Sequence, residues 1–312
     1  MTLKERFIIQ VPASTANLGP GFDSIGLAVD LYLTLEVELN DKWEFITESR
    51  ELEQFPGDEQ HFICQVAKQV ATRYGKILHP CKVEMKSDIP LARGLGSSAA
   101  AIVAGIELAD TIGNLGLTKH DKLLFATELE GHPDNAGASL FGGLVIGCYQ
   151  QNQVEIVSFP TIQLEIVAVI PQEELLTKVA REVLPTTFSY NDAVQASAKA
   201  NILVATLLSE NWSLAGKMME QDLFHQPFRK PLIPFYDEIQ SYAKSSGAFG
   251  VALSGAGPTI LCFTEDGKGT QLVQSLKQEF PMMGVKLLKI DNRGSYVCEN
   301  NKDSLVKKGI YS

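Results

Sequence analysis

The chain has 312 residues, with 27 Lys and Arg against 37 Asp and Glu, so its net charge is −10 at pH 7. This acidic balance excludes a basic surface of the kind that binds nucleic acid or an anionic membrane, and any anionic ligand must be held by local donors. Hydrophobic residues make up 45% and charged residues 21%, as is typical of a soluble globular protein, and the length suits two domains.

Cysteines and apolar segments favour a cytoplasmic protein. The five cysteines are odd in number, widely spaced and form no CxxC pair, which indicates a reducing compartment and gives no zinc motif. The N-terminal residues carry charges where a signal peptide needs an apolar core. Two charge-free stretches, residues 135–154 and 245–264, are broken by glycines, and we expect buried strands and loops there instead of membrane helices.

The first half of the chain mixes strands and helices. Leu31, Leu33 and Leu35 alternate with polar residues, as in a half-buried strand. Thr118 and Asp121 form a helix N-cap pattern. In chain order the predicted elements are strands at 6–14 and 28–39 around a Gly/Pro-rich turn, a helix at 58–75, a strand at 81–90, helices at 98–115 and 118–130, and strands at 139–149 and 164–171.

The second half is predicted to be richer in helices, which together with the first half gives an α+β fold. Polar "QQNQ" interrupts the pattern near residue 150, so we divide the chain into domains at 1–155 and 156–312. The predicted elements are helices at 173–184, 190–209, 213–221 and 234–245, two short strands within 250–263, a helix at 269–280 and a strand at 284–291.

The stretch "PLARGLGSSAAA" combines a glycine cluster with the start of a helix. A helix N-terminus leaves backbone N–H groups unpaired and carries partial positive charge, so it attracts phosphate. Gly94 and Gly96 remove side chains where the backbone must wrap an anion. The stretch is neither a Walker A motif nor a Rossmann fingerprint, because it has no Gly-Lys pair and Ala99 stands where the third glycine would be. The alternative is a tight strand–helix turn without a ligand.

Five blocks together resemble one family over essentially the whole chain. "PLARGLGSSAAA" is similar to the ATP-binding motif of the GHMP kinases, the small-molecule kinases named after galactokinase, homoserine kinase, mevalonate kinase and phosphomevalonate kinase. "VPASTANLGPGFDSIGLAVDLY" resembles the first family motif and "LSGAGPTILCF" the third. "EGHPDNAGASLFGG" and "AREVLP" complete the series in the expected order.

The resemblance implies a two-domain kinase with an N-terminal domain like domain 2 of ribosomal protein S5 and a C-terminal ferredoxin-like domain. ATP and the substrate would lie between them. The form of the first motif implies L-homoserine as the phosphoryl acceptor, on the route to threonine. The residues implied in ATP binding are Pro90, Leu91, Ala92, Arg93, Gly94, Leu95, Gly96, Ser97, Ser98, Ala99, Ala100 and Ala101.

Phosphoryl transfer needs a metal ion between the β- and γ-phosphates, and hard oxygen ligands suit Mg²⁺. The resemblance assigns this role to Glu130 in "ELEG", with Ser98 as its partner. Glu128 is the rival carboxylate, although residues i and i+2 face different sides of a helix. A solvated glutamate at a helix end is the structural alternative for Glu130.

L-Homoserine carries an ammonium group, a carboxylate and a hydroxyl, so its site needs an anion and a fork-shaped cation. Asp23 and Asn17 would meet the ammonium group. Arg181 and Arg229 match the family positions that grip the carboxylate, since guanidinium groups bind carboxylates bidentately. Thr177 is a further candidate nearby. Taken singly, Asp23 could instead cap a turn and Arg229 form a surface ion pair.

His132 and Asn135 match family positions beside the substrate hydroxyl. Related kinases have an aspartate base where this chain has Asn135. A loose transition state needs little early deprotonation, so we hypothesise that catalysis uses no dedicated base and expect Asp134 to face elsewhere. The pair His61-Phe62 replaces an asparagine-containing pair that is common in the family near the adenine.

Two other functions remain open on sequence grounds. One is a GHMP kinase for another small alcohol, mevalonate-like or sugar-like. The other is a non-catalytic nucleotide sensor on the same fold, against which Ser98, Glu130 and Asn135 argue, because a sensor could lose them. A homodimer is expected from the family alone, and neither nucleic acid nor a membrane is expected as a partner.

Overall fold

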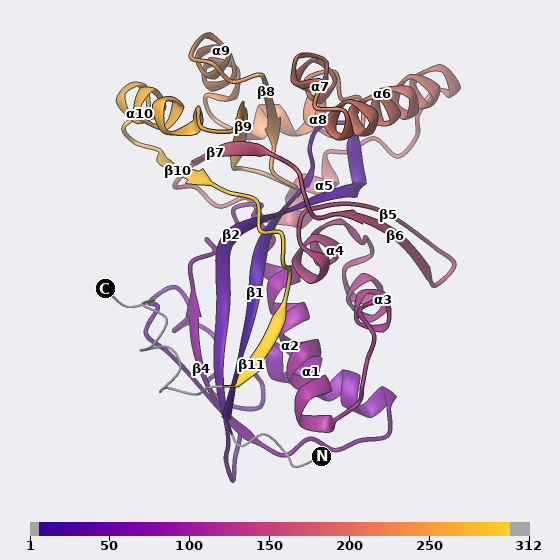
Figure 1. Ribbon diagram of the computed structural model, residues 1–312, viewed down its shortest axis with the longest axis vertical. Helices are drawn as coiled ribbons and strands as arrows, with labels where there is room; N and C mark the ends of the chain where they lie inside the picture. The colour runs from indigo at the N-terminus through magenta and orange to yellow at the C-terminus, as the bar shows by residue number, and fades with distance from the viewer. Residues whose placement is uncertain (1–5, 300–312) are drawn as a thin grey trace.

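A computed structural model describes residues 6–299 as two α+β layers stacked along the long axis (Figure 1). The lower layer is built on a seven-stranded sheet in the order β11-β1-β2-β4-β3, with β5 pairing with β2 and β6. Its strands are β1 (Arg6–Asn17), β2 (Gly21–Leu39), β3 (Glu44–Thr47), β4 (Cys81–Ser87), β5 (Leu144–Gln150), β6 (Gln153–Phe159) and β11 (Tyr296–Glu299).

Helices pack beside this sheet in the lower layer, as Figure 1 shows. They are α1 (Phe62–Arg73), α2 (Ser97–Gly113), α3 (Lys119–Glu130) and α4 (Asp134–Phe141). The alanines and Gly105 of α2 make it the central helix, because small side chains permit close approach. A Cβ at Gly105 would lie 2.8 Å from the Ile63 carbonyl oxygen of α1. Residues along most of α2 are buried, so its first turn is held firmly in place.

The upper layer is a four-stranded antiparallel sheet in the order β10-β7-β9-β8. Alternate residues of β7 face opposite ways: Ile166 and Ala168 join the large core, and Val167 and Val169 join a second core below α9 and α10. The elements are β7 (Leu164–Ile170), α5 (Thr177–Glu182), α6 (Tyr190–Leu208), α7 (Trp212–Met219), α8 (Gln226–Arg229), η1 (Lys230–Leu232), α9 (Tyr236–Ser245), β8 (Gly250–Leu253), β9 (Ile260–Glu265), α10 (Gly269–Glu279) and β10 (Gly284–Leu288).

Two segments cross between the layers. The tip of the β1–β2 hairpin reaches the upper layer next to α7 and α8 (Figure 1), where Gly19 is so close to Met219 that a Cβ would lie 2.8 Å from the Met219 Cα. After β10 the chain returns to the lower layer, and β11 pairs antiparallel with β1. The cavity described below lies beside the hairpin tip.

Most predicted elements are confirmed, including the α+β class and the Thr118–Asp121 capping box of α3. Two interpretations are wrong. Residues Ser139–Phe141 end helix α4 instead of beginning a strand, because the helix is set by buried small residues between the sheet and α2. The polar "QQNQ" forms the turn of the β5–β6 hairpin, and the chain passes between the sheets only after Phe159.

Candidate active site

A cavity of about 780 Å³ lies between the layers and collects residues from both. Its walls come from the β1–β2 hairpin, the glycine loop before α2, the end of α3, the start of α4, helix α5 and the loop after β8. A cleft between domains with converging polar groups is the usual place for a small-molecule site.

The first turn of α2 opens onto this cavity with its backbone N–H groups uncapped. Its N-cap is Gly96, in the left-handed region with φ +71°, and no side chain within residues 6–299 caps the first turn. The first turn also carries no acidic residue that would repel an anion. Unpaired N–H groups and the positive end of the helix dipole therefore face a space that suits phosphate oxygens.

Three glycine-rich blocks meet at the loop before α2. The Ser254 hydroxyl lies 2.6 Å from the Gly94 carbonyl oxygen and 2.9 Å from the Thr15 hydroxyl. A Cβ at Gly94 would overlap the Ser254 carbonyl oxygen, and one at Gly96 would overlap the Ser14 hydroxyl. Glycine is required at both positions, because the backbones approach without room for a side chain.

Arg93 of this loop turns away from the cavity. Its guanidinium donates to carbonyl oxygens of the upper layer, to Pro171 at 3.1 Å and to Gln172, and lies 3.4 Å from Glu174. The Leu175 N–H donates to the Ala92 carbonyl oxygen at 3.3 Å. The loop is thus attached to the segment that leads into α5. Arg93 links the glycine loop of the lower layer to the upper layer and does not line the cavity.

The end of the cavity next to α1 is apolar and aromatic. His61 stacks on Phe45 with ring centroids 4.3 Å apart and an interplanar angle of 6°. Its Nδ1 accepts the Ile63 N–H at 3.2 Å, and burial lowers the pKa of His61 to about 4, so the ring is neutral. Phe55 and Phe62 line the same end. A flat apolar group, such as a purine ring, suits this surface.

Glu130 stands at the C-terminal end of α3 and lines the cavity. Its Oε2 is buried without a hydrogen-bond partner among the described residues, and the Ser98 hydroxyl is near enough to favour the charged form of the carboxyl group. Burial raises the pKa of Glu130 from its ordinary value of 4.5 to about 7, with the charge of His132 opposing the shift. An unpartnered carboxylate oxygen next to a hydroxyl is a donor set that suits a magnesium ion.

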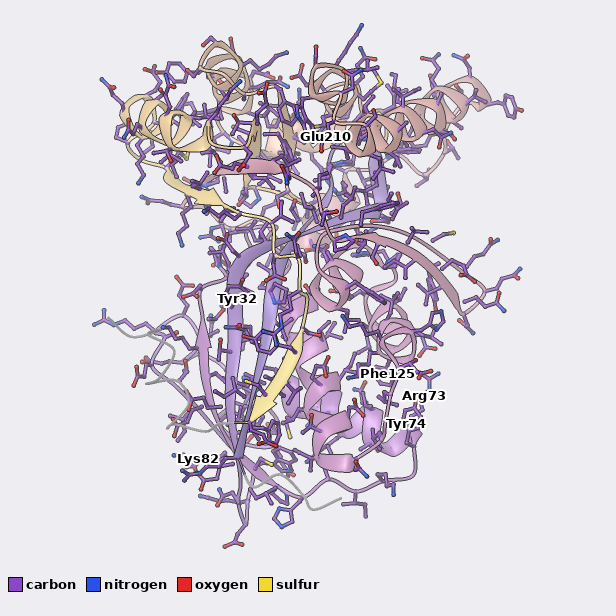
Figure 2. The ribbon with its side chains drawn as sticks, viewed as in Figure 1. Tyr32, Arg73, Tyr74, Lys82, Phe125 and Glu210 are labelled. Atoms are coloured by element: carbon purple, nitrogen blue, oxygen red, sulfur yellow. The ribbon has the colours of Figure 1, made fainter. Side chains whose placement is uncertain are left out.

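The rival carboxylate Glu128 faces outward. It forms a bidentate ion pair with Arg73, at 2.6 and 3.0 Å. The Arg73 guanidinium lies 5.4 Å from the ring centroid of Phe125, and Figure 2 shows Arg73 and Phe125 side by side at the outer edge of the lower layer. Glu128 is therefore a surface residue away from the cavity.

Asp23 and Arg181 form an ion pair at the mouth of the cavity. The two guanidinium nitrogens lie 2.9 and 3.1 Å from the two carboxylate oxygens. Asp23 is oriented by its backbone, which has φ +53° and donates its N–H to the Asn17 side chain at 3.0 Å. The aromatic ring of Phe22 lies 5.7 Å below the Arg181 guanidinium. Asp23 was predicted to bind the ammonium group of the substrate and Arg181 its carboxylate, and here the two residues pair with each other.

Arg229 is buried, with 1% of its surface exposed, and among the described residues it has no ion-pair partner. Its Nε donates to the Ala180 carbonyl oxygen and its Nη1 to the Gly255 carbonyl oxygen, each at 3.0 Å. The ring of Phe22 lies 5.3 Å from the guanidinium. Burial lowers the pKa of Arg229 to about 10, so the group is still charged at pH 7. A buried cation without a counterion calls for an anionic ligand.

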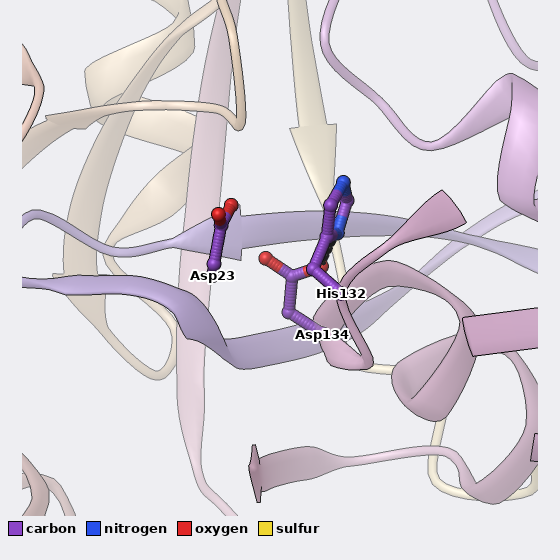
Figure 3. A group of neighbouring side chains, drawn as sticks. All are labelled: Asp23, His132 and Asp134. Atoms are coloured by element: carbon purple, nitrogen blue, oxygen red, sulfur yellow. Dashed lines mark hydrogen bonds and ion pairs between the residues drawn. The ribbon is translucent and has the colours of Figure 1, made fainter. Parts of the chain in front are cut away.

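His132 and Asp134 form a second ion pair in the same cavity, with Nδ1 2.5 Å from Oδ1. Burial favours the neutral ring, but the hydrogen bond and charge of Asp134 raise the pKa of His132 to about 9. Figure 3 shows Asp23 across a gap from this pair, and one ligand atom of each of the three residues lies within 4.8 Å of the others. A charged imidazole is a poor metal ligand, so we do not assign a metal to this trio. Our expectation that Asp134 faces elsewhere was wrong.

Asn135 is the second residue of α4, beside the same pair, and lines the cavity. Its amide nitrogen donates to the Ser14 hydroxyl at 3.1 Å. The amide oxygen is left for a ligand, because no donor from the described residues hydrogen-bonds to it.

The structure brings most of the predicted site residues to this one cavity. Those that line it are Asn17, Asp23, Leu91, Ala92, Gly94, Gly96, Ser97, Ser98, Ala99, Ala101, Glu130, His132, Asn135, Thr177, Arg181 and Arg229. The predicted residues Pro90, Arg93, Leu95 and Ala100 do not line it, and Leu95 and Ala100 are core residues. Sequence reasoning missed Phe22, which stands next to Asp23 in the first motif, and His225, which stands four residues before Arg229.

Two family models match the chain: the GHMP kinases N terminal domain over residues 61–143 and the GHMP kinases C terminal over residues 203–281. The chain belongs to the GHMP kinase family, whose members use ATP to phosphorylate small molecules. The two-domain fold implied by the five blocks is thereby confirmed.

Relatives within this family are homoserine kinases. The chain is 51% identical to homoserine kinase of Bacillus licheniformis, covering 96% of this chain and 98% of the relative, and 53% identical to that of Bacillus pumilus, covering 96% and 97%. A crystal structure of homoserine kinase from Cytophaga hutchinsonii superposes with a TM-score of 0.84 at 29% identity, covering 96% and 99%. Within residues 6–299, the helices are all too short or too polar to cross a membrane.

Proposed function

We propose that the chain is a homoserine kinase that transfers the γ-phosphoryl group of ATP to the hydroxyl of L-homoserine and forms O-phospho-L-homoserine, a step toward threonine. Relatives matched over 96% of the chain carry this activity in their names. The single structural observation that carries the proposal is the buried, unpaired Arg229 beside the Asp23–Arg181 pair, because these groups complement a zwitterion.

The amino-acid end of the substrate lies between the two charges. Asp23 receives the ammonium group, and Arg181 and Arg229 bind the carboxylate with charge-assisted hydrogen bonds. Binding requires Arg181 to leave Asp23, and the ligand supplies a charge for each. Asn17 keeps the backbone of Asp23 in place, and Thr177 stands at the start of the helix that carries Arg181.

The nucleotide lies along the rest of the cavity. The first turn of α2 and the glycines before it receive the phosphates, and the aromatic end near His61 receives the base. Residues 6–299 offer no lysine that lines this cavity, so phosphate charge is met by backbone N–H groups. Arg93 contributes by holding the loop to the upper layer.

Glu130 and Ser98 would hold a magnesium ion, and the buried, unpartnered Oε2 of Glu130 is the observation that fits it. Such an ion, when bound with ATP, neutralises charge on the β- and γ-phosphates. The protein's own task is positioning. Asn135 orients the substrate hydroxyl toward the γ-phosphorus, and His132, as a cation, faces the charge that develops between them.

Catalysis uses no dedicated base. The new bond forms between the substrate oxygen and the γ-phosphorus while the bond to the β-phosphate oxygen breaks. The hydroxyl proton leaves late in a loose transition state, to water or to the transferred phosphoryl group. The carboxylate of Asp134 is engaged by His132 and by the Asn135 N–H, at 2.5 and 2.6 Å, and does not need to accept this proton.

An ATP-consumption assay with L-homoserine, mevalonate, galactose and shikimate tests the proposal. We expect turnover with L-homoserine and no more than background with the others. Preference for mevalonate or galactose would assign the chain to another GHMP activity, and no turnover with intact ATP binding would make it a sensor. The free cysteines fit the cytoplasm as its location, and size-exclusion chromatography tests the expected homodimer.

A further inference from the structure

His225 is a fully buried histidine between Arg229, a residue proposed to bind the carboxylate, and the β1–β2 hairpin, which carries Asp23. Its Nε2 lies 3.0 Å from the Gly19 carbonyl oxygen at the tip of the β1–β2 hairpin. Its Nδ1 lies 3.2 Å from Nη1 of Arg229. Its ring stacks on Phe22 with centroids 5.4 Å apart, so it also contacts the ring that supports both guanidinium groups.

The partners of His225 fix its protonation state. A guanidinium group only donates, so Nδ1 must accept from Arg229 and carries no hydrogen. A carbonyl oxygen only accepts, so Nε2 carries the hydrogen and donates to Gly19. The ring is therefore neutral, in agreement with burial, which lowers the pKa of His225 to about 4. The Asp222 carboxylate, 3.4 Å from Nε2, is already engaged by the backbone N–H groups of Phe224, His225 and Gln226.

Arg229 depends on this acceptor for its orientation. The hydrogen bonds that it makes within residues 6–299 come from Nε and Nη1, and none comes from Nη2. Three protein acceptors thus fix the plane of the guanidinium and leave one amino group for a ligand. The ring that supplies one of these acceptors also holds the hairpin that carries Asn17 and Asp23.

We propose that His225 is a positioning residue that, as the neutral Nε2–H tautomer, couples Arg229 to the β1–β2 hairpin and so sets the distance between the sites for the carboxylate and the ammonium group. This inference rests on the proposed function. It goes beyond that function by assigning the geometry of amino-acid recognition to a residue that does not touch the substrate.

Two amide variants separate the two hydrogen bonds of the ring. In His225→Asn the amide oxygen takes the place of Nδ1 and keeps the acceptor for Arg229. In His225→Gln the amide nitrogen takes the place of Nε2, which keeps the donor to Gly19 and removes the acceptor. A matched control is His120→Gln, because the Nε2 of His120 also bonds to a carbonyl oxygen, that of Val154, at 2.9 Å and away from the cavity.

KM and kcat are measured for L-homoserine and ATP, together with melting temperatures. We expect His225→Gln to raise the KM for L-homoserine about 10-fold or more, as for loss of one hydrogen bond to a charged group, with the KM for ATP within about 2-fold. His225→Asn should raise the KM for L-homoserine less, by about 3-fold, and His120→Gln should not change this KM. Equal increases in Asn and Gln, or equal effects on both substrates, would overturn the inference.

A nitrogen-15 spectrum of the wild type tests the tautomer without any variant. We expect a hydrogen on Nε2 and none on Nδ1 from pH 5.5 to 8, and the opposite tautomer would refute the proposal even if the variants fail to fold. The proposed function has a separate outcome. A wild type that does not phosphorylate L-homoserine overturns that function, whereas an active wild type with unaffected Gln and Asn variants overturns only the role of His225.

Discussion

Among the single residues of the cavity, Arg229 is the one whose environment makes the strongest demand on the ligand. Taking a guanidinium group out of water costs several kcal/mol, by order of magnitude, unless an anion or good acceptors compensate. Here three acceptors, two of them backbone carbonyl oxygens, surround a charge that has no counterion within residues 6–299. The folded protein therefore contains an arrangement that a carboxylate completes.

Arg229→Leu tests this interpretation. Loss of charge-assisted hydrogen bonds worth about 1.5–3 kcal/mol should raise the KM for L-homoserine by roughly 10- to 100-fold. The KM for ATP should change little, because the hydrogen bonds of Arg229 within residues 6–299 go to Ala180, His225 and Gly255 and not to the α2 loop. Steady-state kinetics on both substrates decide the matter, with Arg73→Leu as the control for loss of a paired arginine outside the cavity. A large loss of ATP affinity would contradict the assignment.

Glu130→Gln should stabilise the ligand-free protein at alkaline pH. Because the folded-state pKa of this carboxyl is raised to about 7, the folded chain holds the proton more tightly than the unfolded one between about pH 4.5 and 7. The free energy of unfolding contributed by Glu130 therefore falls as pH rises through this window. Melting temperatures of Glu130→Gln and wild type should agree near pH 4.5 and diverge by pH 8, with the variant higher.

The neighbouring change Glu128→Gln is the control, since it removes an exposed ion pair and should show no such gain. Magnesium with a nucleotide should raise the melting temperature of the wild type more than that of Glu130→Gln. A variant that is less stable than the wild type at pH 8 without ligand would show that Glu130 is paired in solution.

Asp134→Asn tests the absence of a base. The variant loses the charge that keeps His132 protonated, so the pKa of His132 should fall from about 9. We expect kcat at pH 8 to drop by less than about 10-fold, since a general base contributes roughly 10²- to 10⁴-fold. A larger drop in kcat, with the affinities for ATP and L-homoserine unchanged, would identify Asp134 as the base.

At the scale of elements, the start of α2 is defined by backbone geometry. Gly96 has φ +71°, and a Cβ there would collide with Ser14. Gly75, after α1, has φ +65° but no atom within 4 Å of such a Cβ. The two glycines share a left-handed backbone and differ only in crowding, so they form a matched pair.

Gly96→Ala should therefore cost more than Gly75→Ala. The left-handed conformation costs roughly 1–2 kcal/mol for an alanine at either position. At Gly96 the collision with Ser14 adds to this conformational cost and displaces the glycine loop before α2. The KM for ATP should therefore rise at least about 10-fold. Gly75→Ala should lower the melting temperature slightly and leave both KM values unchanged. Equal kinetics in the two variants would show that the loop does not hold the nucleotide.

The long elements could be predicted because their patterns are strong. The alternation in β2 and the alanine run of α2 give clear signals of strand and helix. The elements β3 and β11 were missed because each has four residues and pairs with a strand far away in the chain. The hairpin strand β6 was missed because polar residues interrupt its apolar pattern. Helix α4 was missed in part because its glycine and alanines pack well only against the tertiary surroundings.

The sequence predicted which residues belong to the site better than it predicted which of them contact each other. Glycine spacing pointed to Gly94, and the resemblance to the GHMP kinases pointed to Glu130 and Arg229. The contact between Asp23 and Arg181 joins residues 158 positions apart, and local pattern carries no information about it. His225 gave no signal either, because a buried histidine between a carbonyl oxygen and an arginine is indistinguishable in sequence from one in any core.

At the scale of the whole molecule, the two layers do not correspond to two continuous halves of the chain. β11, near the end of the described residues, pairs with β1 at the beginning. Ser295 donates to Glu107 of α2 at 2.8 Å, and Glu107 pairs with the buried Lys122 at 2.7 Å. The lower layer is therefore completed by the C-terminal part of the chain.

A fragment of residues 1–159 should not reproduce the lower layer on its own. Without β11 the edge of β1 is left unpaired, and the Glu107–Lys122 pair loses the Ser295 hydroxyl. We expect the fragment to show no cooperative thermal transition in near-ultraviolet circular dichroism, whereas the full chain does. A fragment that melts cooperatively near the temperature of the full chain would establish the lower layer as an independent folding unit.

The ion pair of Asp23 with Arg181 has a consequence for small molecules that resemble half of the substrate. 3-Aminopropan-1-ol lacks the carboxylate, so it would pair with Asp23 and leave Arg181 without an anion. 4-Hydroxybutanoate lacks the ammonium group, so it would pair with Arg181 and leave Asp23 without a cation. Each truncated alcohol must therefore separate two charges and can compensate only one of them. Discrimination against both is built into the cavity, since the contact between Asp23 and Arg181 is replaced without loss only by a molecule that carries the two charges at once.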